Sequence, residues 1–329
     1  MLDNDAQVNV CFEKVGSPLH AACKFGSRDI VHLFLDRGAD VNAFSEQMGT
    51  PLRVACKNGH IPIVRILIDK DADVNLFSKQ KGSPLYAACK RGSTKIVKLL
   101  LDRKAEINRY SEQKGSPLYA ACKHRCYNIV KLLIERGAEV NACSKKIGSP
   151  LHGACENGSY DIVKLLLDKS ADVNLFTEQV GSPLHAACKN AKSEIVKLLL
   201  DRGADVNLFS ELVGSPLHVA VENEYLTMVK LFLDKGADVN KFSEQVESPL
   251  QIACEKGCDD MIKILLENGG KINQVATDGT SPLYKAFQYG HDRIVKRLLK
   301  MGAEVNTCFE NVVHPMFTKY AIGQHENDC

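Results

Sequence analysis

Cysteine and histidine are the residues of this 329-residue chain whose types and spacing could support chemistry. Seven cysteines recur at multiples of one interval, namely Cys23, Cys56, Cys89, Cys122, Cys155, Cys188 and Cys254. Four histidines share another repeating position, namely His20, His152, His185 and His218. Clustered thiols and imidazoles bind metals, form disulfides or act as nucleophile and base. Their use therefore depends on whether the fold gathers them.

The spacing argues against all three kinds of chemistry. Equivalent residues in stacked helices lie about 8–10 Å apart, beyond the roughly 7 Å Cα separation that a disulfide tolerates. The chain has no C-x-x-C pair of a zinc site and no Walker loop, G-x-G-x-x-G, H-E-x-x-H or G-x-S-x-G motif. We therefore predict no catalytic residue, no cofactor and no metal, and we interpret the repeating cysteines as small buried core residues.

The elements that position these residues come from a 33-residue repeat. Ser/Thr-Pro-Leu begins at residues 17, 50, 83, 116, 149, 182, 215, 248 and 281, without insertion or deletion. Asn recurs with the same step from Asn9 to Asn306. Self-similarity at such a period indicates a stacked solenoid in which each unit contacts its neighbours, rather than two globular domains.

Each unit predicts two short helices and a connecting finger. Ser17 is a good N-cap, Pro18 suits the first helical position, and Gly26 can end the first helix in a left-handed conformation. The apolar stripe within residues 30–35 predicts a second helix. Residues 42–49 are too few for another helix and contain turn formers, so we expect a hairpin-like finger that joins successive units.

These features resemble the ankyrin repeat, over residues 2 to 320, in segments such as SPLHAA at 182–187 and DRGADVN at 201–207. The resemblance implies an all-α solenoid of stacked helix-turn-helix units with short hairpin-like fingers. It also implies a concave face, built from fingers and first helices, that binds proteins without catalysis. Histidines at the position of His20 are implied to be scaffold residues that bond to their own Ser/Thr and to neighbouring backbone.

We expect one array over residues 1–329, with a partial repeat at 1–16, nine repeats at 17–313 and a truncated repeat or tail at 314–329. The partial repeat has two explanations: the chain begins inside a longer array, or its first unit is atypical, as terminal units often are. The finger departs from the family pattern, because Ser45 and Met48 replace the usual Asp and Gly, and Gly49 comes one position late. We expect its turn to differ.

Six residues replace a turn glycine of the repeat. Arg125, Ala191 and Glu224 do so after the first helix, and Asp71, Lys104 and Ser170 do so after the second. A non-glycine residue in a left-handed conformation is strained by on the order of 1 kcal/mol, so we expect these joints to be local weak points.

An aromatic line lies two residues after the repeating Asn. It consists of Phe44, Phe77, Tyr110, Phe176, Phe209 and Phe242. One explanation is that the rings stack finger against finger and stabilise the altered turn. The other is that they form an exposed apolar stripe that anchors a partner.

Charge changes sign along the chain although 42 basic and 40 acidic side chains give a net charge of only +2. The early repeats carry Lys57, Lys81, Lys90, Lys114 and Lys123 on the expected binding face, and later repeats carry mostly Glu there. This pattern is either simple solvation or a device that orients an extended partner of reversed charge. We count these five lysines and the six aromatics as the candidate partner-binding residues.

The expected function is that of a non-enzymatic scaffold that binds a protein or peptide. One alternative is polyanion or nucleic-acid binding by the basic N-terminal half, which the near-zero net charge disfavours. Another is an adaptor array within a larger multidomain protein. The chain has no run of about 18 apolar residues and no signal peptide, and its 13 cysteines do not resemble a secreted disulfide framework. We expect a monomer without membrane insertion in a reducing compartment, the cytoplasm, with the nucleus left open.

Overall fold

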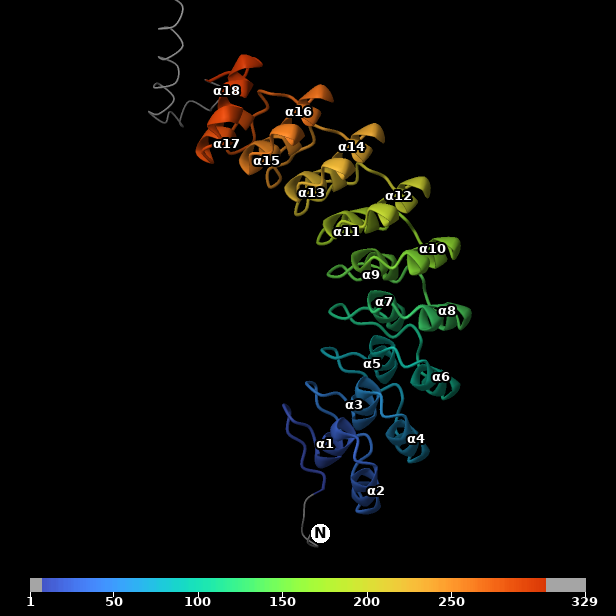
Figure 1. Cartoon of the computed structure of the whole chain (residues 1–329). Helices are drawn as coiled ribbons and strands as arrows, with labels where there is room; N and C mark the ends of the chain where they lie inside the picture. The colour runs from blue at the N-terminus through green and yellow to red at the C-terminus, as the bar shows by residue number, and fades with distance from the viewer. Residues whose placement is uncertain (1–7, 306–329) are drawn as a thin grey trace, which may run out of the picture. The chain divides into compact units, whose positions relative to one another are not determined.

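The computed structural model describes residues 8–305, in which eighteen α-helices follow one another (Figure 1). Asn306, Cys308, Cys329 and the predicted tail at 314–329 lie outside the described residues. The chain divides between Leu175 and Phe176 into two compact units, which we call the N-terminal unit and the C-terminal unit. Each repeat contributes a first and a second helix, so the predicted all-α stack of helix-turn-helix units is confirmed. That the two units form one array remains a prediction.

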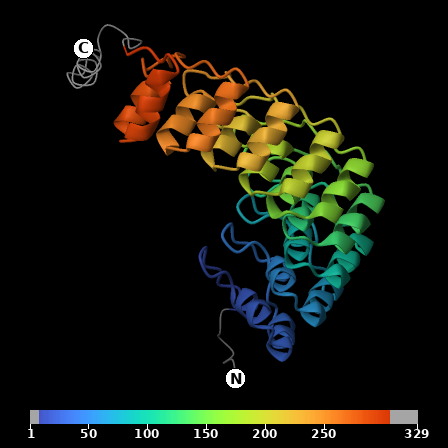
Figure 2. The ribbon, with the colours of Figure 1, turned by 45° about the horizontal axis from the view of Figure 1, so that its top comes forward.

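Within each unit the first helices follow one another in one row and the second helices in another (Figures 1 and 2). The first helices of the N-terminal unit are α1 (Pro18–Phe25), α3 (Pro51–Asn58), α5 (Pro84–Arg91), α7 (Pro117–Lys123) and α9 (Pro150–Asn157). Its second helices are α2 (Arg28–Asp36), α4 (Ile61–Asp69), α6 (Thr94–Asp102), α8 (Tyr127–Glu135) and α10 (Tyr160–Asp168).

The C-terminal unit has the same arrangement. Its first helices are α11 (Pro183–Lys189), α13 (Pro216–Glu222), α15 (Pro249–Lys256) and α17 (Pro282–Gln288). Its second helices are α12 (Ser193–Asp201), α14 (Leu226–Asp234), α16 (Asp259–Glu267) and α18 (Asp292–Lys300).

Local chemistry fixes where the first helices begin and end. Thr50 has extended backbone angles, and its hydroxyl accepts a hydrogen bond from the Arg53 N–H at 3.1 Å, while Pro51 takes the first helical position. Gly59 ends α3 with φ 82°, a left-handed angle that glycine adopts without strain. The predicted caps are thus confirmed.

The core of each unit lies between its helices. Leu19 and Cys23 of α1 and Val31 of α2 are fully buried. All seven repeating cysteines are buried free thiols, and burial raises the pKa of Cys23 to about 12. A thiolate is therefore disfavoured at neutral pH, which fits the predicted role of these cysteines as small core residues.

The repeating asparagines connect each repeat to the next. Asn42 Oδ1 accepts from the backbone N–H of Asp73 at 2.8 Å, and Asn240 bonds in the same way to Lys271 at 2.8 Å. The Asn240 amide also donates to the Gly269 carbonyl at 2.9 Å. These bonds explain why Asn keeps the period of the repeat.

Seven fingers, from Phe12–Gly16 to Ser210–Gly214, are short turns closed by an antiparallel bridge, with two backbone hydrogen bonds between Ser45 and Gly49 in the first complete finger. Neighbouring fingers are joined by a serine ladder, in which five finger serines donate their hydroxyls to a carbonyl of the preceding finger. The bonds are Ser45 to Glu13, Ser78 to Glu46, Ser111 to Lys79, Ser144 to Glu112 and Ser210 to Glu178. The departure of the turn from the family pattern thus places a buried serine where it ties fingers together.

All six predicted joints without glycine have left-handed backbone. Asp71, Lys104, Arg125, Ser170, Ala191 and Glu224 have φ between 54° and 62°. Within residues 8–305 no other non-glycine residue has positive φ. The period alone predicted these angles, because glycine with positive φ occupies the same positions in the other repeats.

Candidate protein-binding surface

The predicted binding residues lie on two adjoining parts of each repeat, the first helix and the finger before it. Lys57, Lys90 and Lys123 come from α3, α5 and α7, and Lys81 and Lys114 lie in the fingers that precede α5 and α7. The serine ladder joins the fingers, and each first helix packs on the next within its unit. The fingers and first helices of one unit therefore form a continuous surface, which we call the finger face.

The finger aromatics differ in exposure. Phe44, Tyr110 and Phe242 are exposed, with 41%, 38% and 38% of their surface accessible. Phe77, Phe176 and Phe209 are half-buried. The first three rings are thus the ones with the most apolar surface to offer a partner.

Contacts of the half-buried rings are to histidines and cations. Phe209 meets His218 edge to face with 5.5 Å between ring centroids, and Lys241 Nζ lies 5.5 Å from the same ring. The Arg109 guanidinium lies 5.0 Å from Phe77, and Phe176 meets His185 at 6.4 Å. Cation–π and edge-to-face contacts of this kind stabilise rings at a surface.

Stacking of one finger ring on the next does not occur in the described residues of either unit. The serine ladder supplies the contact between fingers instead. Tyr110 also differs from the phenylalanines, because its hydroxyl donates to the Glu112 carboxylate, and this bond raises the pKa of Tyr110 to about 12.

Two hollows on the finger face of the N-terminal unit are lined by cations. One, of about 330 Å³, is lined by Arg53, Lys57, Lys81, Tyr86, Ala87, Lys90, Arg91 and Lys114. The other, of about 200 Å³, is lined by Lys24, Gln47, Met48, Arg53, Val54, Lys57, Asn58 and Lys81. They share three basic residues, and neither has an acidic residue in its lining. We call the two together the basic groove.

Arg53 is the one buried cation of the basic groove, with 8% of its surface exposed. It occupies the repeat position that elsewhere holds His, Tyr or Gln. Its guanidinium donates to the Met48 carbonyl at 2.8 Å and, through two nitrogens, to the Lys81 carbonyl at 3.2 and 3.3 Å. Burial lowers the pKa of Arg53 to about 10, which leaves it charged at neutral pH.

Lys123 does not belong to the basic groove, although it was predicted together with Lys57 and Lys90. Its ammonium forms an ion pair with Glu156 at 3.1 Å and donates to the Tyr119 hydroxyl at 3.3 Å. Glu156 occupies the same repeat position as Lys123, 33 residues later, and it is the first acidic residue at that position along the chain.

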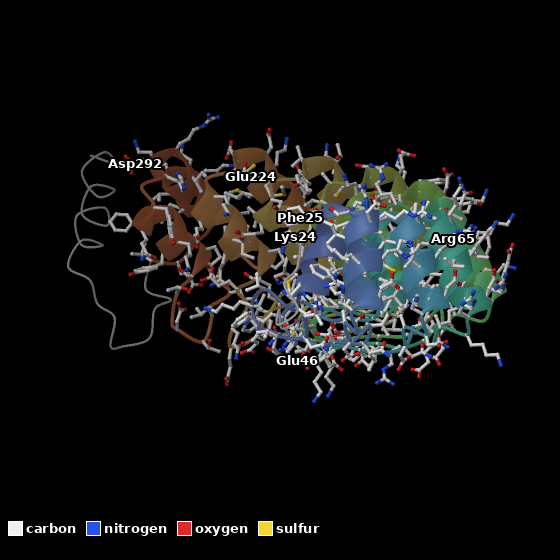
Figure 3. All side chains as sticks on the ribbon, turned by 90° about the horizontal axis from the view of Figure 1, so that it is seen from below. Lys24, Phe25, Glu46, Arg65, Glu224 and Asp292 are labelled. Carbon is white, nitrogen blue, oxygen red and sulfur yellow. The ribbon has the colours of Figure 1, made fainter. Side chains whose placement is uncertain are left out.

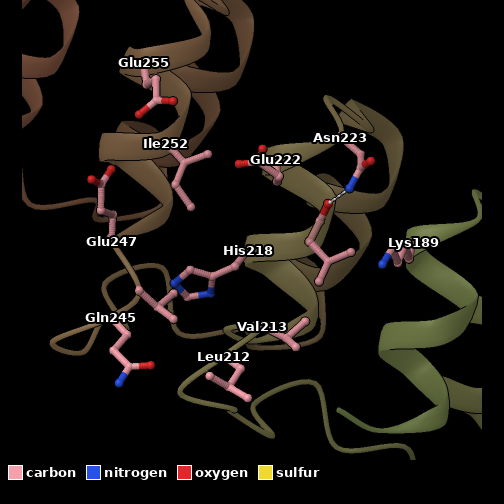
Figure 4. A pocket seen from close by; sticks show the side chains of 12 residues that line it. Lys189, Leu212, Val213, His218, Glu222, Asn223, Gln245, Glu247, Ile252 and Glu255 are labelled. Atoms are coloured by element: carbon pink, nitrogen blue, oxygen red, sulfur yellow. Dashed lines mark hydrogen bonds between the residues drawn. The ribbon is translucent and has the colours of Figure 1, made fainter. Parts of the chain in front are cut away.

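The C-terminal unit has a different hollow on its finger face, of about 500 Å³ (Figure 4). Leu212, Val213, Val246 and Ile252 give it an apolar part, and Glu222, Glu247 and Glu255 lie at its rim. These acids have cationic partners: Lys256 contacts Glu222 at 2.7 Å, and the buried Lys285 contacts Glu247 and, at 3.7 Å, Glu255. Three acidic residues of the predicted charge pattern are therefore neutralised within the unit.

The repeating histidines have structural bonds. His20 Nδ1 accepts from the Ser17 N–H at 3.0 Å, and its Nε2 lies 3.0 Å from the Gly49 carbonyl of the next repeat. Burial lowers the pKa of His20, and it lowers the pKa of His218 to about 4. The implied scaffold role of these side chains is therefore confirmed for these two residues. Among the described residues no three His, Cys, Asp or Glu side chains group as a metal site.

Sequence reasoning missed Arg53, Tyr86 and Arg91 as neighbours of the predicted lysines. Arg53 and Tyr86 stood at the scaffold position of the repeat, and this hid their place in the basic groove. A usable signal was the change from His to Arg at a position where every other residue is neutral at neutral pH.

A family model that comprises three copies of the ankyrin repeat matches the chain at residues 1–78, 76–144, 142–210 and 217–307. Since these matches cover most of the chain, the protein belongs to the ankyrin-repeat family, whose repeats are in general modules of protein–protein interaction. Comparison with curated proteins gave no match. No helix in residues 8–305 combines the length and the apolar character that a membrane crossing needs.

Proposed function

We propose that the chain is a non-enzymatic scaffold that binds a protein or peptide on its finger face, with the finger aromatics and the early lysines as contacts. Ankyrin-repeat proteins are typically non-enzymatic, and their repeats in general bind proteins. We further propose that the scaffold acts as a monomer in a reducing intracellular compartment.

The observation that carries this proposal is a difference in charge pairing between the two faces of the N-terminal unit. Ion pairs link successive repeats on the second-helix side: Lys70 with Asp36 at 3.6 Å, Arg103 with Asp69 at 3.2 Å and Arg136 with Asp102 at 3.6 Å. The finger face instead carries the unneutralised basic groove beside exposed rings such as Phe44 and Tyr110. A surface with unpaired charge and exposed rings is the one that gains most from a partner.

Removal of exposed rings tests this proposal. The chain carrying Phe44→Ser and Tyr110→Ser is used as bait for a quantitative pull-down, next to the wild type. A matched control carries Tyr127→Ser and Tyr160→Ser, which remove rings of similar exposure, 42% and 44%, from the second helices α8 and α10.

We expect partners that the wild type and the control retain to be lost from the finger variant. Circular dichroism of all three proteins checks that the fold is kept. If the control variant loses the partners and the finger variant keeps them, the binding surface lies on the second helices and the proposal fails.

A further inference from the structure

The cations of the basic groove have no acidic partner. Within residues 8–305, no ion pair involves any of the seven groove cations, Lys24, Arg53, Lys57, Lys81, Lys90, Arg91 and Lys114. Two lysines on finger faces outside the groove, Lys123 and Lys285, are neutralised by ion pairs. The groove therefore concentrates positive charge that the fold itself leaves uncompensated.

Acidic residues of the adjacent fingers form hydrogen bonds with residues outside the groove. The Glu46 carboxylate accepts from the Ser78 hydroxyl at 3.0 Å, and the Glu112 carboxylate accepts from Ser144 at 3.1 Å and from the Tyr110 hydroxyl. Figure 3 shows Glu46 at the finger edge, apart from Lys24 at the end of α1. These acids thus serve the contacts between fingers and do not neutralise the groove.

The cations of the groove repel one another, and Lys57 lies among four of them. Its pKa is lowered, first by partial burial and then by the charges of Arg53, Lys81, Lys90 and Lys24. A bound anion would relieve this repulsion, so the ligand should favour protonated Lys57.

The free hydrogen-bond donors of the groove fit a ligand that carries several separate anionic groups. The deepest guanidinium, that of Arg53, already uses three of its nitrogens on backbone carbonyls, so it is not available to clamp a phosphate through two parallel bonds. Five of the other cations are lysines, which act as point charges on flexible stems. Carboxylates spread along a chain match such donors better than one phosphate group does.

The length of the groove fits a short extended segment. Its cations come from α1, α3, α5 and the finger before α7, which belong to four successive repeats. Three steps of about 8–10 Å between packed helices give roughly 25–30 Å. An extended peptide covers this distance with about eight residues, at roughly 3.3 Å per residue.

We propose that the basic groove binds an extended segment of about eight residues, rich in Glu and Asp, of a partner protein. This inference rests on the proposed function of the finger face in protein binding and adds the chemistry of the partner. Ala87 lines the larger hollow and Val54 the smaller one, and these small buried residues leave a peptide backbone room to approach while the lysines reach its carboxylates.

Fluorescence anisotropy with a labelled ten-residue peptide of alternating Glu and Ser tests the inference on the full chain. We expect binding that weakens as salt is raised from about 50 to 200 mM. Lys57→Gln with Lys90→Gln should weaken binding about tenfold, from two lost charge contacts. The matched control, Lys131→Gln with Lys164→Gln on α8 and α10, should stay within about twofold.

Two further probes separate other anions. A peptide with one phosphoserine and no Glu tests a phosphate site, and a single-stranded oligonucleotide of equal charge tests a polyanion site. Tighter binding of either probe than of the Glu peptide overturns the inference, as does equal weakening by the groove and control variants. Failure of every probe to bind also overturns it.

Nuclear magnetic resonance of the wild type gives a readout that needs no variant. The pKa of the Lys57 ammonium should rise when the Glu peptide is bound, and an unchanged value in the complex contradicts binding in the groove. The pull-down with the finger variants is a separate test. If the finger variant loses its partner while no acidic peptide binds, only the groove inference fails, and the proposed function stands.

Discussion

Replacement of His218 by glutamine should remove a large part of the acid sensitivity of the C-terminal unit. His218 lies on α13, where its Nδ1 accepts from the Ser215 N–H at 3.1 Å and its Nε2 lies 3.0 Å from the Lys241 carbonyl. With Nδ1 accepting, Nε2 carries the proton and donates to this carbonyl, so the buried ring is neutral. Burial lowers its pKa from 6.5 to about 4.

The direction of the effect follows from the two pKa values. Between pH 6.5 and about 4 the unfolded chain binds a proton at His218 and the folded chain does not. Above pH 6.5 His218 is neutral in both states and does not reduce the free energy of unfolding. As the pH falls from 6.5 toward 4, protonation of the unfolded chain lowers that free energy. Since one pKa unit corresponds to about 1.36 kcal/mol, the loss at pH 4.5 amounts to about 2.5 kcal/mol.

Gln251, at the same position one repeat later, shows that glutamine can make the same bonds. Its Oε1 accepts from the Ser248 N–H at 3.0 Å, and its Nε2 donates to the Thr280 carbonyl at 2.8 Å. His218→Gln should therefore keep the bonds without a group that titrates in this range. The reverse change, Gln251→His, should introduce acid sensitivity in the next repeat.

Hydrogen exchange of the α13 amides at pH 7 and 4.5, corrected for intrinsic rates, measures the local free energy of opening. Wild type should lose about 2.5 kcal/mol more than His218→Gln between these pH values, because all other titrating groups are common to both. An equal loss in both proteins, or an imidazole that titrates near 6.5 in the folded wild type, refutes the reasoning.

Three further predictions concern the joints and the fingers. Arg125→Gly should stabilise the N-terminal unit by about 1 kcal/mol in urea unfolding, because it relieves a left-handed arginine, and the reciprocal Gly158→Arg should destabilise it by a similar amount. In the wild type the repeat with Lys104 and Arg125 should exchange amide hydrogen early, and uniform protection along the unit contradicts this. Ser210→Ala should cost about 1 kcal/mol and speed proteolysis of its finger, since the Glu178 carbonyl loses its donor. Ser243→Ala, where the hydroxyl accepts local bonds, should cost less, and equal effects of the two changes argue against the serine ladder.

The regular part of the fold could be predicted because the same residue types recur at the same positions of successive repeats. The left-handed angle of Arg125 followed from the glycines at the same position in other repeats, and the cap at Thr50 followed from its residue type and Pro51. Such features depend on neighbours close in sequence, which the sequence displays directly.

The parts that escaped prediction depend on contacts between repeats. The bond from Ser210 to Glu178 joins residues 32 positions apart, and it supplies the contact between fingers that one of the two explanations had assigned to stacked rings. The ion pair of Lys123 with Glu156 likewise joins two repeats. Which of several polar side chains meet across this distance is decided by rotamers and backbone spacing, and residue types alone do not fix either.

The asparagine bonds have a consequence for how such a chain can change in length. Each Asn side chain serves only the repeat that follows it, as Asn42 serves Asp73 and Asn75 serves Glu106. Excision or duplication of one whole period inside a unit would therefore bring an identical donor and acceptor together at the new junction. An excision or duplication that is out of phase by even one residue would separate the donor from the acceptor and leave both without a hydrogen-bond partner. The architecture is thus open to growth and loss in steps of 33 residues and resists every other increment.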